Sequence, residues 1–433
     1  MSRIAEIAAA LAGYDPQALS VDGVRSFLSH LVAPAVVRER EHVALIDALG
    51  RVLAEDIVSP FDVPPHDNSA MDGFAFDGAR LEAGTPDVAL RIAGTAFAGA
   101  AWRGALAPGD AVKIMTGAVM PAGLDTVVPQ EFCTVEGDTV RFPARALRRG
   151  DNRRFAGEDL KRGRPALLQG QRITPAALGL VASLGLAEVP VLRRLRVAYF
   201  STGDEILSLG DAAREGAVYD SNRYTVFGLL TRLGCEVVDL GMVRDNPAAL
   251  ADALRDAAGR ADAIVTSGGV SVGEADHTRA VMRQLGDMAF WRVAMRPGRP
   301  MAVGLIPRAS PAGSAVLFGL PGNPVAVMVT FLAFVRPALL QQMGCNAASA
   351  EPPPLLRARS VAAIRKKPGR TEYQRGRVTP VPGALPEVRI AGNQGSGVLS
   401  SMVDGNGLVV LHHDQGSVAP GDEVDVMMFD GVV

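Results

Sequence analysis

Apolar residues near the amino terminus recur at steps of three and four positions, the spacing of one face of a helix. The stripe consists of Val21, Val24, Phe27, Leu28 and Leu31. Ser20 stands just before it, where a serine hydroxyl can accept a hydrogen bond from the first turn of a helix. The pattern therefore predicts an amphipathic helix that begins after Ser20 and is closed by Pro34.

The pattern changes between residues 60 and 148. Apolar and polar residues alternate here in short runs between turns, at residues 73–76, 89–92, 111–114 and 139–142. Alternation with a period of two is typical of strands with one buried face. This stretch is predicted to form a small β-rich domain.

Strand-like and helical segments alternate from residue 196 onward. Apolar runs at 197–200, 236–240 and 263–266 precede helical patterns at 220–234, 246–259 and 276–286. This alternation predicts a parallel sheet covered by helices on both faces. A long helix is expected over 323–342, and the short strands and turns after Pro352 indicate a terminal β-barrel. The predicted fold class is multidomain α/β plus β, with a doubly wound α/β domain.

Composition and charge argue against several classes of protein. Hydrophobic residues make up 48% of the 433 residues and charged residues 21%, as in globular proteins rather than disordered chains. Lys and Arg total 44 against 46 acidic residues, which argues against a protein that coats nucleic acid. The 3 cysteines lie far apart and form no zinc or disulfide pattern, so a cytoplasmic location is expected. The longest apolar run, residues 325–335, is too short for a membrane span and is expected to be a buried helix.

A glycine-rich turn follows the third predicted strand, and ligands bind beyond the carboxyl ends of strands in open α/β sheets. The turn contains Ser267, Gly268, Gly269, Ser271 and Gly273. Glycine N–H groups and serine hydroxyls ahead of a helix N-terminus can cradle a phosphate. A merely tight turn has the same composition, so the pattern alone leaves both interpretations open.

Three carboxylates also follow the strands, namely Glu205, Asp245 and Asp276. They could converge on one Mg²⁺, which takes one or two carboxylates together with phosphate oxygens and water. Asp245 and Asp276 stand at or next to helix starts, where aspartate also caps backbone N–H groups. Metal binding and capping both remain open for these two residues.

Two basic clusters accompany the turn. One holds Arg292, Arg296 and Arg299, and the other combines residues 365–370 with Arg375 and Arg377. A run of charges is often only a solvated face. Two such clusters around a phosphate-binding turn favour an anionic substrate.

Nine short motifs occur along the chain in a fixed order. Together they resemble the family of molybdopterin molybdenumtransferases, which includes the bacterial MoeA proteins and the E domain of gephyrin. The similarity extends from about residue 22 to the carboxyl terminus. The motifs are PHDNSAMDG (65–73), IMTGA (114–118), GED (157–159), STGDE (201–205), YDSNR (219–223), SGGVSVGEAD (267–276), RPGRP (296–300), LPGNP (320–324) and GNQGSG (392–397).

The resemblance implies an elongated homodimer whose subunits have four parts. A linking domain in two segments, residues 1–60 and 149–192, would carry a β-rich inserted domain over 61–148. An α/β domain of the molybdopterin-binding type would span 193–345, and a C-terminal β-barrel domain 346–433. The implied reaction takes adenylated molybdopterin and molybdate, uses Mg²⁺ as cofactor, inserts molybdenum and releases AMP. Transient contact with molybdopterin adenylyltransferase is also expected, and neither nucleic acid nor membrane is expected as a partner.

The resemblance also implies roles for individual residues. Positions linked to catalysis match Asp67, Thr116, Asp159, Glu205, Asp245 and Asp276, and the last three are the expected metal ligands. Positions linked to ligand binding match Arg292, Arg296, Arg375 and Ser396, which join the turn residues Ser267, Gly268, Gly269, Ser271 and Gly273. The family often has lysine where this chain has Arg292 and Arg296, which keeps the charge but changes reach and geometry. Asp67 and Thr116 would complete a cleft shared between two subunits.

Two other functions compete with that of an insertase. Molybdopterin adenylyltransferase shares the Ser-Gly-Gly type of turn, but it is normally a single α/β domain, so the β-rich insertion and the barrel disfavour it. A gephyrin-like scaffold would hold a partner peptide in its dimer groove. The sequence shows no fused adenylyltransferase domain and no long linker, which disfavours scaffolding.

Overall fold

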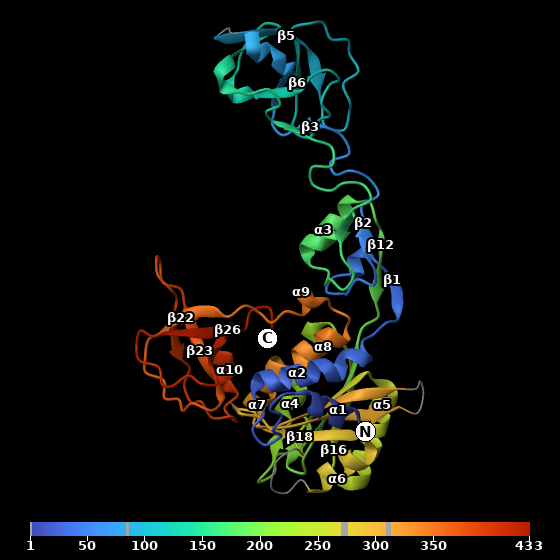
Figure 1. The fold of residues 1–433 in the computed structure, drawn as a ribbon, viewed down its shortest axis with the longest axis vertical. Helices are drawn as coiled ribbons and strands as arrows, with labels where there is room; N and C mark the ends of the chain where they lie inside the picture. The colour runs from blue at the N-terminus through green and yellow to red at the C-terminus, as the bar shows by residue number, and fades with distance from the viewer. Residues whose placement is uncertain (1, 84–85, 270–275, 309–312) are drawn as a thin grey trace. The chain divides into compact units, whose positions relative to one another are not determined.

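The computed structural model describes residues 2–83, 86–269, 276–308 and 313–433, and the chain forms two units with separate cores (Figure 1). The larger unit comprises Met1–Glu55, Gln169–Pro175 and Glu188–Val433, and the smaller one Asp56–Leu168 and Ala176–Ala187. The four-domain division expected from the resemblance is finer than these two units and stays a prediction.

A six-stranded sheet lies at the centre of the larger unit, in the order β16-β13-β17-β21-β20-β18. The first four strands are parallel, as predicted, but β20 pairs antiparallel with both of its neighbours, β21 and β18. Residues 293–299 and 308–313, which connect these strands, are too few for a crossover helix, so each strand turns straight back. The strands are β13 (Arg196–Thr202), β16 (Glu236–Val243), β17 (Ala263–Ser267), β18 (Asp287–Arg292), β20 (Pro300–Pro307) and β21 (Ser314–Leu320).

Alternate residues of the central strands enter two different cores. In β13, Val197 and Tyr199 belong to one core, whereas Ala198 and Phe200 belong to the other. Helices α2 (Val21–Val32), α4 (Ser221–Leu233), α7 (Pro324–Thr330) and α8 (Arg336–Gln342) contribute to the first core. Helices α5 (Pro247–Arg260) and α6 (Asp276–Leu285) contribute to the second. The sheet is therefore covered on both faces, as the strand–helix alternation predicts.

Local caps explain where these helices begin and end. The Asp220 side chain accepts from Arg223 N before α4, and Gly234 ends that helix with a φ of 95°. Asn246 accepts from Ala249 N before α5, and Pro247 occupies its first turn. The predicted helix over 323–342 is α7 and α8 joined by a π-helical turn, Phe331–Val335. This segment is long and apolar enough to cross a membrane, yet 78% of its most apolar window is buried inside the protein.

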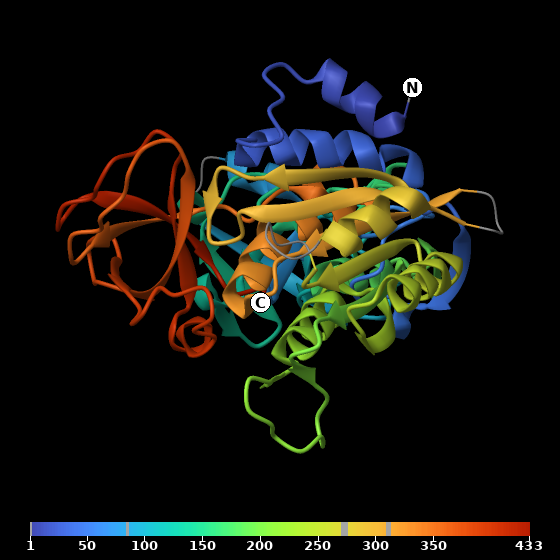
Figure 2. The same cartoon turned by 90° about the horizontal axis from the view of Figure 1, so that it is seen from below.

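The carboxyl-terminal part of the larger unit is the predicted β-barrel. Strand β23 (Thr371–Thr379) pairs with both β24 (Glu387–Ile390) and β25 (Gly407–Leu411). The ring closes through β22 (Leu356–Ser360) and β26 (Glu423–Met428), which pair with each other. Figure 2 shows these red strands curling around their own core beside the central sheet. The predicted fold class is confirmed.

Shorter elements complete the larger unit. Its helices are α1 (Arg3–Ala10), α9 (Ala347–Ala350) and α10 (Ser400–Asp404). Its short strands are β1 (Arg40–Ala44), β12 (Glu188–Leu192), β14 (Ile206–Leu207), β15 (Val218–Tyr219) and β19 (Met295–Arg296).

The smaller unit contains a second six-stranded sheet, in the order β7-β4-β6-β5-β9-β8. The four short strands predicted from alternation are β4 (Gly73–Phe76), β5 (Asp87–Ala96), β6 (Asp110–Ile114) and β9 (Thr139–Pro143). Sequence alternation did not single out β7 (Thr126–Pro129) or β8 (Thr134–Glu136). Other elements are α3 (Pro175–Ser183), β2 (Ile57–Val58), β3 (Asn68–Ser69), β10 (Arg153–Arg154) and β11 (Pro165–Leu167).

Candidate functional site

A cavity of about 830 Å³ lies at the carboxyl edge of the parallel strands in the larger unit. Four sequence motifs that are distant in the chain meet there, because parallel strands bring their carboxyl ends to one edge. A loop of the barrel supplies the remaining wall. The lining includes Thr202, Gly203, Glu205, Asp245, Gly268, Gly269, Arg296, Arg299, Gly322, Asn323, Gln394 and Ser396.

The glycine-rich turn after β17 passes very close to the end of β13. Gly268 has a φ of 91°, and a Cβ built on it would lie 2.3 Å from the Thr202 carbonyl oxygen. Glycine is therefore required at this position. The Gly268 N–H already donates to Leu320 O (3.2 Å), so this group is not free for a phosphate. Ser271 and Gly273, also predicted to belong to the cradle, lie outside the described residues.

Glu205 and Asp245 are exposed carboxylates that line the cavity. Asp245 Oδ1 accepts from Thr278 Oγ1 (3.3 Å), whereas the cap of α5 is Asn246. Capping of α5 is thus excluded for Asp245. Asp276 is the first residue of α6, but its side chain lies outside the described part of the chain. Within that part, no three His, Cys, Asp or Glu side chains cluster as metal ligands, so the expected trio remains a prediction.

Arginines from the segment after β18 line the same cavity. Arg296 and Arg299 line the cavity and are exposed, and neither guanidinium has an ion-pair partner among the residues described. They present positive charge to whatever enters the cavity. Arg292, the third predicted cation, ends β18 and pairs with Pro300, but it is not part of the lining.

Arg375 has a different position from the one expected of a ligand-binding cation. It is only 1% exposed, and its guanidinium donates to Ser401 Oγ (2.9 Å), Asn393 O (3.1 Å) and Gly395 O (2.9 Å). Burial and the nearby Arg296 charge lower its pKa. Arg375 therefore holds the loop 393–396, whereas Ser396 on that loop lines the cavity.

Gln394 fixes the same loop from the cavity side. Its Oε1 accepts from Arg375 N (2.8 Å), and its Nε2 donates to Arg375 O (3.1 Å) and Ala391 O (2.5 Å). The Ser396 carbonyl accepts from Val325 N (3.0 Å), which ties the loop to the first turn of α7. The barrel thus contributes to the cavity through a loop anchored at both ends.

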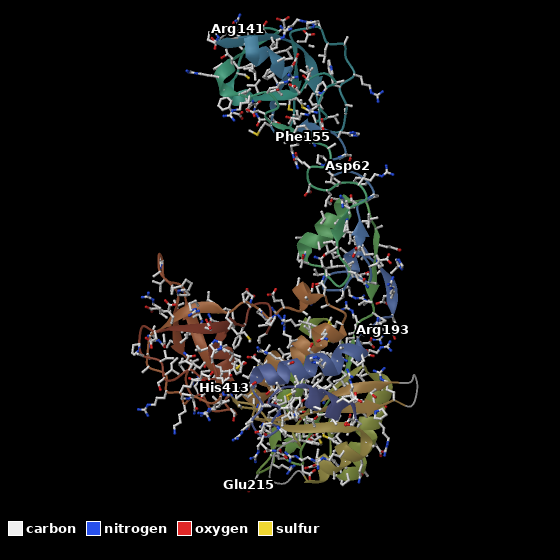
Figure 3. The ribbon with its side chains drawn as sticks, viewed as in Figure 1. Asp62, Arg141, Phe155, Arg193, Glu215 and His413 are labelled. Carbon is white, nitrogen blue, oxygen red and sulfur yellow. The ribbon has the colours of Figure 1, made fainter. Side chains whose placement is uncertain are left out.

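The predicted residues of the smaller unit lie in loops near β3. Asp67 Oδ2 accepts from Arg153, and Oδ1 accepts from Ala156 N (2.8 Å). The Ala156 N–H and the Arg153 charge lower the pKa of Asp67 against the opposing effect of burial. The Arg153 guanidinium also lies over the ring of Phe155, 4.8 Å from its centroid. Phe155 is labelled in Figure 3.

Thr116 and Asp159 lie on loops that are hydrogen-bonded to residues 63–72, the segment that carries Asp67. Thr116 donates to Asp72 Oδ1 through both its N (2.7 Å) and its Oγ1 (2.8 Å), which lowers the pKa of Asp72. The Asp159 N–H donates to Val63 O (3.0 Å), and its side chain is exposed. The three predicted residues of this unit therefore lie on adjoining loops.

Several lining residues were not singled out by sequence reasoning. Thr202, Asn323 and Gln394 line the cavity, and Asp72 binds Thr116. Each lies inside one of the nine motifs, so the motif order marked the right segments. Which side chain of a motif faces the cavity depends on the backbone conformation of its turn. The periodicity of hydrophobic residues carries no information about that conformation.

The fold and the site define a class: a multidomain α/β protein whose sheet edge and terminal barrel form a cavity lined by both carboxylates and arginines. Three family models match the chain. They are the MoeA N-terminal region (domain I and II) at residues 19–185, a probable molybdopterin binding domain at 198–341, and the MoeA C-terminal region (domain IV) at 357–429. The chain belongs to the MoeA family.

Individual relatives agree with this membership. The chain is 40% identical over 414 residues to a molybdopterin molybdenumtransferase of Haemophilus influenzae, covering 95% of this chain and 99% of that one. It is 35% identical to the Nostoc protein of the same name, covering 90% and 89%. A molybdopterin biosynthesis MoeA protein of Pyrococcus horikoshii superposes with a TM-score of 0.74 at 26% identity, over 95% of this chain and 100% of that chain.

Proposed function

We propose that this protein is a molybdenum insertase, a transferase of molybdenum cofactor biosynthesis that acts on a molybdopterin substrate. The family membership supports the transferase class and the pathway. The finer proposal is that adenylated molybdopterin and molybdate react in the cavity and AMP is released. One observation carries it: Glu205 and Asp245 line the same cavity as Arg296, Arg299 and Ser396.

The carboxylates suit the cofactor that this reaction implies. Mg²⁺ prefers hard oxygen ligands, and Glu205 and Asp245 supply carboxylate oxygens at the cavity wall. With Asp276 they would hold the ion, which when bound would neutralise charge on a phosphoanhydride. The Thr278 hydroxyl orients Asp245 through Oδ1 and leaves its second oxygen available.

The arginines and the serine of the lining suit an oxyanion. Molybdate is a tetrahedral dianion, so it needs cations and hydrogen-bond donors on several sides. Arg296 and Arg299 supply fixed positive charge, and the Ser396 hydroxyl supplies a donor from the barrel loop. Arg375 and Gln394 hold that loop in position through their hydrogen bonds, so they fix the place of Ser396.

The cellular location, the oligomeric state and the partner protein are proposed from the same family membership. The protein would act in the cytoplasm as a homodimer, in which Asp67 and Thr116 of one subunit complete the site of the other. It would receive its substrate by transient contact with molybdopterin adenylyltransferase. Adenylyltransferase activity for this chain itself is not favoured, because the MoeA N-terminal and C-terminal models match it on either side of the molybdopterin binding domain.

The test is a reconstitution with adenylated molybdopterin, Mg²⁺ and molybdate, in which AMP is measured by chromatography. We expect AMP release that requires molybdate and consumes the adenylate. Formation of adenylate from molybdopterin and ATP would instead identify an adenylyltransferase. No turnover in either direction by a folded protein would favour a scaffold.

A further inference from the structure

The amino-terminal segment, residues 2–19, lies along β18, the last strand of the central sheet. An edge strand leaves backbone N–H and C=O groups unpaired unless another part of the chain covers them. Arg292 N, at the end of β18, donates to Pro16 O (2.8 Å). Ala294 N, just after the strand, donates to Leu19 O (2.8 Å). The segment therefore adds a short stretch of backbone pairing to this edge of the sheet.

Aromatic side chains fix the middle of the amino-terminal segment. Trp291 Nε1 donates to Tyr14 Oη (2.8 Å). The Tyr14 ring stacks on Phe27 with 5.9 Å between centroids, and Phe27 meets Trp291 edge-on at 4.9 Å. Phe27 and Trp291 are only 0% and 2% exposed. Tyr14 therefore joins the segment to both α2 and β18 through buried rings.

Helix α1 anchors the same segment at the other end of β18. Ile4 N donates to Asp287 Oδ2 (2.9 Å), and Asp287 is the first residue of that strand. Ile4 and Ile7, three positions apart on one face of α1, are buried in the core that α2 shares. Figure 2 shows the dark-blue helix α1 lying beside α2. The amino-terminal segment thus contacts both ends of β18.

The backbone that this segment holds leads directly into the turn that carries the cavity arginines. Val293 pairs with Leu19, and its N–H donates to Arg299 O (2.7 Å), which closes the turn over residues 293–299. Strand β19 lies within this turn and pairs with β23 of the barrel. Arg296 and Arg299 line the cavity. The turn is therefore fixed between two supports, β23 and the amino-terminal segment.

We propose that the amino-terminal segment is a positioning element that sets where Arg296 and Arg299 stand in the cavity. This role rests on the proposed function. Neither guanidinium has an ion-pair partner among the residues described, so the backbone of the turn sets the position of each charge. A displacement of about 1 Å in a binding group can cost on the order of a hundredfold in rate. The matched MoeA N-terminal region begins at residue 19, so family membership assigns residues 2–18 no role.

The test is deletion of residues 2–18, which keeps Leu19 and the Ser20 cap of α2. By hydrogen-exchange mass spectrometry, the amides of residues 292–296 should exchange about tenfold faster, whereas those of β21 should not change. The half-saturating molybdate concentration should rise about tenfold, the loss typical of one charge-assisted hydrogen bond, with a maximal rate near that of wild type. A synthetic peptide of residues 2–18, added in excess, should reverse both changes.

Two substitutions accompany the deletion. Tyr14→Ala removes the ring contact and the hydrogen bond from Trp291, so it should move both measurements in the same direction but less. It carries the test if the deletion variant does not fold. Glu6→Ala breaks an exposed ion pair with Arg3 (3.7 Å) on the same helix and should move neither measurement.

The other outcomes overturn one statement or the other. Wild-type exchange at residues 292–296 in both the deletion variant and Tyr14→Ala would overturn the proposal. Faster exchange with an unchanged half-saturating molybdate concentration would also overturn it, because the segment would hold the backbone without placing the arginines. A fall in maximal rate that neither peptide nor molybdate restores would indicate a general structural role instead. Absence of turnover in the wild-type protein would overturn the proposed function, whereas the exchange result does not depend on turnover.

Discussion

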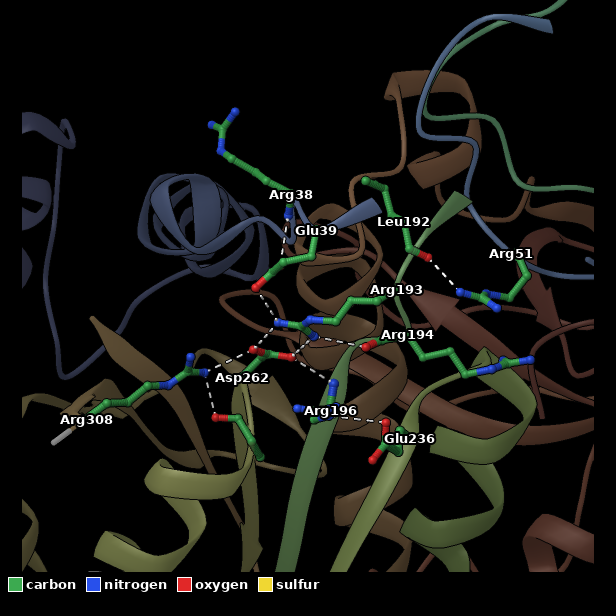
Figure 4. A network of polar contacts seen from close by, with 11 residues as sticks. Arg38, Glu39, Arg51, Leu192, Arg193, Arg194, Arg196, Glu236, Asp262 and Arg308 are labelled. Carbon is green, nitrogen blue, oxygen red and sulfur yellow. Dashed lines mark hydrogen bonds and ion pairs between the residues drawn. The ribbon is translucent and has the colours of Figure 1, made fainter. Parts of the chain in front are cut away.

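Asp262 holds together the amino edge of the central sheet, opposite the cavity. It lies directly before β17 and is 8% exposed (Figure 4). Its carboxylate accepts from Arg193 Nη1 (2.6 Å), Arg193 Nη2 (3.0 Å), Arg196 N (2.9 Å) and Arg308 Nη2 (3.1 Å). Asp262→Ala would leave the Arg308 guanidinium without its counter-charge and would leave Arg193 with only the more exposed Glu39, whose carboxylate lies 3.3 Å from Nη2.

The expected loss of stability follows from this burial. The Arg193 and Arg308 side chains are only 21% and 17% exposed, so water replaces the lost contacts poorly. Removing one partner of a buried ion pair costs about 3–5 kcal/mol. Large domains shift by about 2–4 °C per kcal/mol, so the apparent Tm should fall by roughly 6–20 °C.

The assay is thermal unfolding of wild type and Asp262→Ala at several pH values. Burial alone would raise the pKa of Asp262, but the hydrogen bonds from Arg193, Arg196 N and Arg308 lower it overall. The stabilisation is therefore fully present above the unfolded pKa, about 4, and is lost as the pH falls through the lower folded value. The difference in Tm should be constant near neutral pH and should shrink in acid.

A matched control comes from the exposed pair of Asp252 and Arg255. Asp252 is 79% exposed and its carboxylate lies 3.0 Å from Arg255 Nη1. Asp252→Ala should change stability by less than about 1 kcal/mol. If Asp262→Ala moved the Tm no more than this control does, burial would not set the strength of the Asp262 network and the reasoning would fail.

Three further predictions concern activity. Asp245→Asn should melt like wild type but lose most adenylate cleavage; a lowered Tm with full specific activity would make the residue structural. Ser396→Ala should raise the half-saturating molybdate concentration about ten- to a hundredfold with partial rescue by excess molybdate, whereas Arg375→Ala should not be rescued, because it releases the whole loop. Rescue of both variants alike would show that Arg375 contacts the oxyanion itself. Mixing inactive Asp67→Ala with inactive Asp276→Ala should restore part of the activity through subunit exchange, and verified exchange without recovery would indicate a site built within one chain.

Local sequence determined most of the elements of this protein. The boundaries of α4 follow from Asp220 and Gly234, because a cap and a left-handed glycine act on their immediate neighbours. The alternation in β13 likewise placed Val197 and Phe200 on opposite faces of a sheet covered on both sides. The order of nine motifs identified the family and the segments that line the cavity, because each motif encodes the shape of its own turn.

Tertiary structure alone decided how those segments combine. The antiparallel direction of β20 depends on its pairing with β21 and β18, and its sequence carries no mark of that direction. Arg375 belongs to a basic cluster in the sequence, but folding buries it behind the loop that carries Ser396. The position of Asp220 Oδ2, which is buried and has no hydrogen-bond partner among the described residues, is also invisible in the sequence, since it depends on neighbours that are distant in the chain. Periodicity reports only contacts between residues a few positions apart, whereas the cavity is made by contacts between residues up to two hundred positions apart.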